Sequence, residues 1–140
     1  MSFSHTHTLS LSLSLSLQYF AKNADGCLRG DAHRGFLVAE TFAHVDAAKP
    51  SPEAEAATDA IAALADDCSE QSTLNDGPAH RIIKRLLAES AGPLLAPKLL
   101  ANMQGHLAEF CAWNRSAFVV VAVFESTPAV AEVKTKEEEG

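Results

Sequence analysis

Apolar residues recur at helical spacing in the second half of the chain, and their pattern predicts two helices that follow each other closely. Within residues 78–91 the apolar positions fall one turn apart, so one side of a helix is apolar and the other is mostly basic. A second apolar stripe runs through residues 97–113. Gly92-Pro93 separates the two segments, and because the connection is short we expect the helices to pack against each other.

A third helix is expected over residues 52–68. Ser51 offers a hydroxyl cap, Pro52 suits the first helical position and Glu53 places an acid in the first turn. Alanine favours helix strongly, and the apolar residues of this segment again fall one turn apart. The three segments predict a mainly α protein, a small helical hairpin or three-helix arrangement within residues 51–124.

Two other segments depart from this helical pattern. Residues 117–124 form a continuous β-branched and aromatic run, AFVVVAVF. Such a run is typical of a strand, and we predict one short C-terminal strand there. Residues 23–50 are rich in turn signals and allow one short helix over 36–45.

Residues 1–22 contain a low-complexity repeat, HTHTLSLSLSLSL, which starts at His5. Alternation of apolar and polar residues is the pattern of a half-buried strand. The genetic code offers a simpler origin, because a CA dinucleotide repeat translates as His-Thr and a CT repeat as Leu-Ser. We therefore interpret the segment as recruited from simple-sequence DNA and expect a disordered N-terminus. Coding DNA with scattered synonymous codons would refute this origin.

A targeting peptide is the functional alternative for the same residues. An acid-free opening rich in Ser and Thr suits an organelle transit peptide, and an apolar stretch suits a secretory signal cleaved near Ala21. Both kinds of signal usually contain basic residues near their start, but the first Lys or Arg of this chain is Lys22. No window reaches the roughly 18 apolar residues that span a bilayer. The composition thus favours an intracellular protein over a secreted or organellar one.

The last residues, 125–140, lack an apolar pattern and carry three consecutive glutamates before the final glycine. Polar, acidic segments bury too little apolar surface to offset the entropy lost on folding. We expect an acidic, disordered C-terminal tail.

Charge and motif content limit the classes of function. A net charge of -7 at pH 7 leaves no basic surplus to displace phosphate counterions, which argues against nucleic acid as a partner. The sequence contains no CxxC, HExxH, GxSxG or phosphate-binding glycine loop. Three scattered cysteines give no disulfide framework. We therefore predict no catalytic residue, metal or cofactor; a Cys and a His brought together by the fold would instead favour an enzyme.

The helix expected at residues 79–90 suggests a way of binding proteins. Its sequence, AHRIIKRLLAES, resembles the LxxLL boxes of nuclear-receptor coactivators, in which a short amphipathic helix docks into a hydrophobic groove. Isoleucine stands here where the family has its first leucine. The partner-binding residues that the resemblance implies are Ile83, Leu86 and Leu87 as anchors and Arg81 and Arg85 as rim charges.

The same helix has two other interpretations. Its apolar residues can form the core of the protein itself, or its basic side can lie on an anionic membrane surface. The sequence as a whole predicts a lineage-specific, non-enzymatic protein that binds another protein through residues 79–90. The alternative is a small secreted or organelle-imported factor with a cleaved N-terminal peptide.

Overall fold

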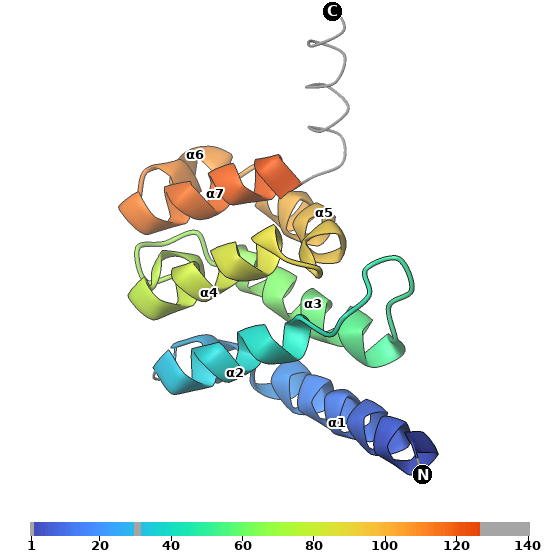
Figure 1. The fold of residues 1–140 in the computed structure, drawn as a ribbon. Coiled ribbons are helices and arrows are strands. Elements are labelled where there is room, and N and C mark those ends of the chain that lie inside the picture. The colour runs from blue at the N-terminus through green and yellow to red at the C-terminus, as the bar shows by residue number, and fades with distance from the viewer. Residues whose placement is uncertain (1, 30–31, 127–140) are drawn as a thin grey trace, which may run out of the picture.

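The computed structural model describes residues 2–29 and 32–126, and every regular element in this part of the chain is helical (Figure 1). Two short 3-10 helices, η1 and η2, connect α3 to α4. The elements are α1 (Ser2–Arg29), α2 (Ala32–Phe42), α3 (Pro52–Ala63), η1 (Leu64–Asp66), η2 (Thr73–Asn75), α4 (Gly77–Ala88), α5 (Gly92–Met103), α6 (Leu107–Cys111) and α7 (Asn114–Ser126).

The helices stack in two layers (Figure 1). In one layer α3 packs between α1 and α5, and in the other α4 packs between α2 and α7. Stacked helical hairpins bury a continuous core between such layers, as in helical-repeat proteins. Helices α1 and α2 form one end of the stack, and α5, α6 and α7 form the other. The largest fully buried side chains are Phe42, Phe110, Leu17, Leu28, Ile61, Leu74, Ile83, Leu86, Leu95, Leu99, Met103 and Val119.

The mainly α prediction is confirmed, and local signals explain where two of the helices begin. The Ser51 hydroxyl accepts a hydrogen bond of 3.1 Å from the Ala54 amide at the start of α3. The carboxylate of Asp76 accepts one of 3.0 Å from the Ala79 amide at the start of α4. Both caps satisfy amides that have no partner within the helix. Helix α3 ends earlier than the expected residue 68, and η1 follows it.

The helix expected over residues 97–113 is divided and begins earlier. Helix α5 starts at Gly92 and ends at Met103, and α6 is separate. Gly105, between them, has a φ of 90°, which glycine adopts without strain. The Gly92-Pro93 pair opens a helix, because proline suits a first helical turn. A Cβ atom at Gly92 would overlap the Leu87 carbonyl, so glycine permits α5 to begin this close to the end of α4.

The strand predicted at residues 117–124 is wrong, because this segment lies within helix α7. Val119 and Val120 are buried on α7, and Val123, one turn further along the helix, is buried on the same side. No strand occurs among residues 2–29 and 32–126 that could pair with it. A helix satisfies its backbone internally, and packing against α4 therefore outweighs the strand preference of valine.

The expected disordered N-terminus also differs from the structure, in which residues 2–29 form α1. The turn predicted near Asn23 is present only as a kink, where φ is -131° and ψ is 29°. A helix needs no neighbouring strand to satisfy its backbone, and Leu17 and Phe20 anchor α1 to the core. Of the tail expected at 125–140, Glu125 and Ser126 end α7, and the remainder lies outside the described residues.

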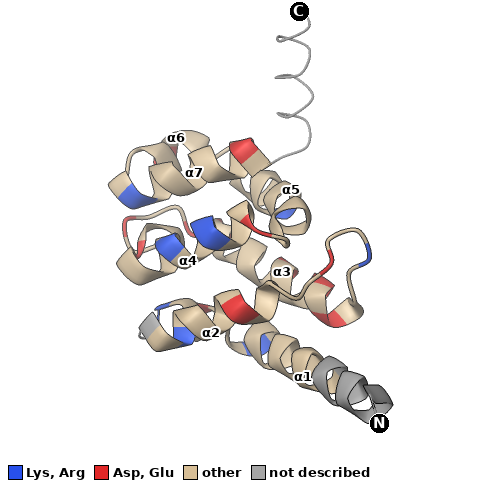
Figure 2. Cartoon of the chain, viewed as in Figure 1, with Lys and Arg blue, Asp and Glu red and all other residues tan. Residues whose placement is uncertain are grey.

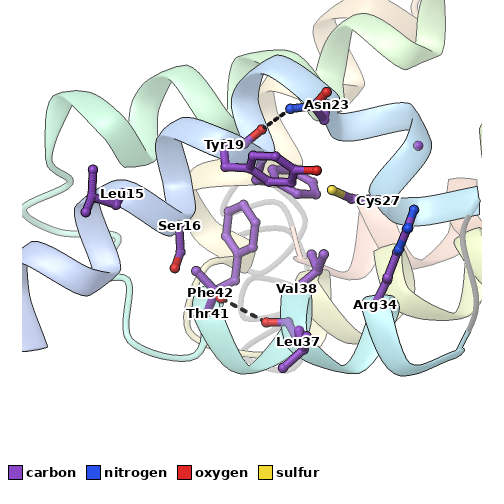
Figure 3. A pocket seen from close by; sticks show the side chains of 12 residues that line it. Leu15, Ser16, Tyr19, Asn23, Cys27, Arg34, Leu37, Val38, Thr41 and Phe42 are labelled. Atoms are coloured by element: carbon purple, nitrogen blue, oxygen red, sulfur yellow. Dashed lines mark hydrogen bonds between the residues drawn. The ribbon is translucent and has the colours of Figure 1, made fainter.

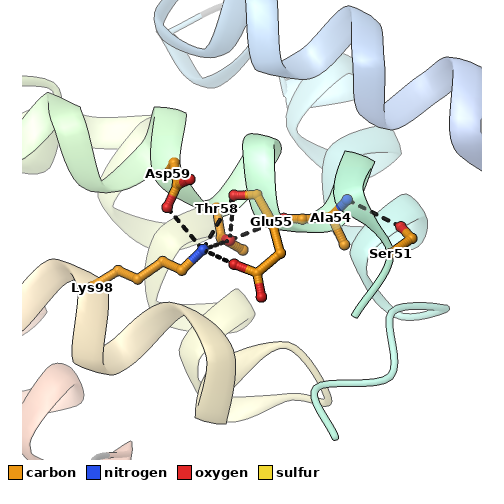
Figure 4. A network of polar contacts seen from close by, with 6 residues as sticks. All are labelled: Ser51, Ala54, Glu55, Thr58, Asp59 and Lys98. Carbon is orange, nitrogen blue, oxygen red and sulfur yellow. Dashed lines mark hydrogen bonds and ion pairs between the residues drawn. The ribbon is translucent and has the colours of Figure 1, made fainter. Parts of the chain in front are cut away.

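Lys98 joins α5 to α3 through a network of polar contacts (Figure 4). Its ammonium lies 2.6 Å from a carboxylate oxygen of Glu55, 2.8 Å from one of Asp59 and 2.9 Å from the Thr58 hydroxyl. Burial lowers the pKa of Lys98, but the hydrogen bonds and charges of Asp59 and Glu55 outweigh it and raise the pKa above its usual value. The network holds two helices of one layer together.

Candidate functional site

The apolar residues predicted to anchor a partner lie inside the protein. Ile83, Leu86 and Leu87 are 0%, 1% and 3% exposed and belong to the core between the layers. A partner could reach them only if α4 left the stack. Arg81, one of the predicted rim charges, is exposed on the outer side of α4.

Arg85, the other predicted rim residue, is engaged by neighbouring acids. Its guanidinium lies 2.8 Å from Glu89 and 3.2 Å from Glu40 of α2, and it stands 5.8 Å from the ring centre of the exposed Phe36. The hydrogen bond to Glu89 raises the pKa of Arg85 above its usual value. The α2 side of α4 is therefore balanced in charge (Figure 2).

Three cations on the α7 side of α4 lack an ion-pair partner in the described part of the chain, although Glu89 and Glu125 line the same hollow as Lys84. Arg81, Lys84 and Arg115 form no ion pair with any residue in 2–29 or 32–126. The Lys84 ammonium lies over the ring of Phe118, 5.0 Å from its centre. We call this surface, formed by Arg81, Lys84, Arg115 and Phe118, the cationic seam. Figure 2 shows Lys and Arg residues on α4 and at the start of α7.

Buried polar contacts position the α7 side of the seam. The side-chain oxygen of Asn75 accepts hydrogen bonds from the amides of Arg115 and Ser116, at 3.1 and 3.2 Å. The Asn75 amide group donates in turn to the Glu70 carbonyl at 2.9 Å. The Arg115 guanidinium approaches the position of Gly77 at the start of α4. The beginnings of α4 and α7, and the cations that they carry, are therefore held side by side.

Along the seam, α7 carries three large apolar side chains that are partly exposed. Phe118 is 59% exposed, Val121 52% and Phe124 37%. They follow one another at intervals of three residues, and so they curve along one side of the helix. Apolar side chains beside unpaired cations suit a ligand that is both acidic and apolar.

A second exposed surface lies at the other end of the stack, on α1 and α2. Leu11, Leu15 and Tyr19 fall at intervals of four residues on α1, and they are 52%, 60% and 65% exposed. Leu37 of α2 is 50% exposed. We call these four residues and the groove beside them the α1–α2 face.

The groove of the α1–α2 face is apolar and has a volume of about 530 Å³ (Figure 3). Phe20 and Phe42 meet edge to face within it, with ring centres 5.2 Å apart. Arg34 is the one charged residue among its lining. Burial raises the pKa of the Cys27 thiol at the groove, and the charge of Arg34 partly opposes this shift.

Ionisable groups elsewhere in residues 2–29 and 32–126 do not gather into a metal site, since no three His, Cys, Asp or Glu side chains converge. The thiols of Cys27, Cys68 and Cys111 are free. No helix in the same residues has the length and hydropathy needed to cross a bilayer.

The segment before Lys22, predicted as a removable peptide in the alternative interpretation, contributes to the core. Leu17 is 1% exposed and Phe20 is 4% exposed. Cleavage near Ala21 would remove both and uncover Phe42, against which Phe20 packs.

Most residues of the cationic seam and of the α1–α2 face were not predicted from the sequence. Lys84 was noted there only as part of a basic helix side, and nothing placed Arg115 or Phe118 next to it. The α1–α2 face depends on the Leu-Ser repeat being helical. The four-residue spacing of Leu11, Leu15 and Tyr19 could have indicated this face, because residues four apart share one side of a helix.

Comparisons with protein-family models, with curated proteins and with solved structures find no match to this chain, so its function must be inferred from its own residues.

Proposed function

We propose that this protein is a non-catalytic protein-binding module whose cationic seam binds an acidic, amphipathic segment of another protein. One observation carries the proposal. In a chain of net charge -7, Arg81, Lys84 and Arg115 gather beside exposed apolar side chains, and no described acid pairs with them. Cations arranged in this way complement an acidic ligand and repel a basic one.

The two parts of this surface have different roles in the proposal. The cations bring an acidic segment to the seam and fix its orientation, because charge complementarity acts mainly on association rate and specificity. Phe118, Val121 and Phe124 supply most of the affinity, since buried aromatic and apolar anchors dominate binding energy. Arg81 keeps the rim role expected for it, while Leu86 and Leu87 support α4 from within the core.

Fluorescence anisotropy with labelled peptides tests the proposal. An amphipathic helical peptide with glutamates on one side and leucines on the other should bind, and its affinity should fall as salt is added. The double substitution Lys84→Glu and Arg115→Glu should weaken binding about tenfold or more. Lys22→Glu combined with Lys49→Glu, at two exposed lysines away from the seam, changes the net charge by the same amount and is the matched control, which should leave the affinity unchanged.

Two comparison peptides and one vesicle experiment can overturn the proposal. A peptide with glutamine in place of glutamate, or with the same residues in scrambled order, should bind much more weakly. Equal binding of all three peptides would show that the seam does not select an acidic amphipathic ligand. Binding to phosphatidylserine vesicles without binding to the acidic peptide would instead favour the membrane-surface interpretation of α4.

A further inference from the structure

The α1–α2 face exposes several large apolar side chains close together. Leu11, Leu15 and Tyr19 form a crest along α1, and each is more than half exposed. Beside the crest lies the groove between α1 and α2, which has Phe20 and Phe42 in its lining. Terminal helices of a stack need a polar outer surface to stay soluble alone, and here the exposed polar side chains beside the crest, such as Ser12, Ser16 and Gln18, are uncharged.

From this face we infer that the protein binds a second copy of itself, with the α1–α2 faces of the two copies in contact across a twofold axis. The inference is independent of the cationic seam. Contacts across a twofold axis bring the same patch of both copies together, so like charges in the patch would repel.

The charge distribution favours a second copy over an unlike partner at this end. The sequence contains no Lys, Arg, Asp or Glu before Lys22. Arg34 is the one charged residue in the groove lining. The crest itself is uncharged and Arg34 lies at the Cys27 end of the groove, so two copies can meet along the crest with little repulsion, although each carries a net charge of -7. Two copies could not associate through the cationic seam, because the cations of one copy would lie against the cations of the other and repel them.

The shape of the face provides both parts of a reciprocal contact. The crest of one copy can enter the groove of the other, while the second crest enters the first groove. This arrangement buries leucine and tyrosine side chains in the groove, whose floor is formed by the nearly buried Phe20, Val38 and Phe42. Figure 3 shows the residues that line it. Tyr19 carries a hydroxyl that can stay at the wet edge of such a contact.

The available area indicates a reversible dimer. At a rise of about 1.5 Å per residue, Leu11 to Cys27 extends roughly 24 Å, and two helices side by side are about 20 Å wide. The face therefore offers on the order of 500 Å² per copy, or about 1,000 Å² buried in total, at the lower limit of specific interfaces. We expect the monomer to predominate at low concentration and the dimer at high concentration.

Sedimentation of the full chain over a wide concentration range tests the inference. The wild-type protein should shift from monomer to dimer, while Leu15→Glu should remain a monomer throughout. Tyr19→Glu should have the same effect, which guards against a folding defect in one variant. Val121→Glu, a comparable exposed position on α7, is the matched control and should dimerise like wild type. Circular dichroism of each variant should show unchanged helicity.

Cys27 reports where the contact lies. In a Cys68→Ser, Cys111→Ser background, alkylation of Cys27 should slow as protein concentration rises, because a second copy covers the groove.

A wild-type chain that stays monomeric at all concentrations would overturn the inference. Dimerisation that survives Leu15→Glu and Tyr19→Glu, or that is lost in Val121→Glu alone, would place the contact elsewhere and also overturn it. The Leu15→Glu variant should still bind the acidic peptide, so dimerisation and binding at the seam can be tested separately.

Discussion

The α1–α2 face and the cationic seam expose similar kinds of apolar side chain toward opposite ends of one stack, but they differ in charge. Leu15 and Tyr19 lie on a helix that has no Lys, Arg, Asp or Glu before Lys22. Phe118 lies under the ammonium of Lys84, with Arg115 one turn earlier on its own helix.

This difference indicates what each surface can accept. An apolar face with few charges tolerates any apolar neighbour, including its own copy, and gains stability mainly from the area it removes from water. A charged apolar face rejects its own copy and selects a ligand of opposite sign. One chain can thus carry a self-association surface and a partner surface that do not compete.

The largest effect is expected from Leu86→Ala combined with Leu87→Ala, in the core that the two surfaces share. Each truncation of a buried leucine costs about 2–5 kcal/mol, so the pair should lower the free energy of unfolding by roughly 4–10 kcal/mol and abolish the fold. Urea titration followed by circular dichroism measures this loss.

Leu11→Ala combined with Leu15→Ala is the matched control, because the same chemical change falls on exposed side chains. Measured at low protein concentration, it should alter stability by no more than about 0.5 kcal/mol per site. Intact helicity of the Leu86, Leu87 double variant, together with loss of a bound partner, would restore these leucines as docking residues.

Removal of residues 1–21 should have the next largest effect, and it deletes most of the α1–α2 face. Leu17 and Phe20 each contribute about 1.5–3 kcal/mol through burial, so the shortened chain should lose roughly 3–6 kcal/mol of stability. Urea unfolding of the chain that begins at Lys22 measures the loss. Unchanged stability would favour the processed, imported form of the protein.

The smallest effect is expected at Lys98, on the α3–α5 contact between the two ends. Lys98→Met should lower the free energy of unfolding by about 1 kcal/mol at neutral pH, since the acids that hold the ammonium are largely solvated. Folding raises the pKa of Lys98, so its contribution is fully present below the unfolded pKa of about 10.4 and is lost as pH rises through the higher folded value.

Unfolding curves of both proteins at neutral and alkaline pH check this prediction. The difference between wild type and Lys98→Met should shrink above about pH 10.4. Lys49→Met, at an exposed lysine, should show little difference at either pH. A gap that persists or widens at alkaline pH would mean that the hydrogen bonds of Lys98 to the Glu55 carbonyl and the Thr58 hydroxyl, and not its charge, stabilise the contact.

The helices that could be predicted from sequence are those whose signals are local. Helix α3 has its cap at Ser51, and α4 has its cap at Asp76 and an apolar stripe one turn apart. The error at α7 has the opposite cause. Valine favours strands, but strand formation depends on a neighbour to pair with, and here the neighbour is helix α4.

The candidate surfaces were harder to predict, because each combines residues from different helices. Arg81 was identified from the basic side of α4 alone. Its association with Arg115 depends on how Asn75 positions the start of α7. Leu86 and Leu87, predicted as anchors, are buried within this chain, and an amphipathic stripe indicates burial but not whether it is against the same chain or another.

The helical state of the Leu-Ser repeat has a consequence for inheritance. Simple DNA repeats gain and lose units during replication, and each added Leu-Ser pair would turn the preceding residues of α1 by about 200°. A leucine that had pointed into the core would then point to solvent, but another leucine of the repeat would take its buried position. Alleles of different length should therefore keep the same folded body and differ in how far α1 projects, which scattering measurements on such alleles can test.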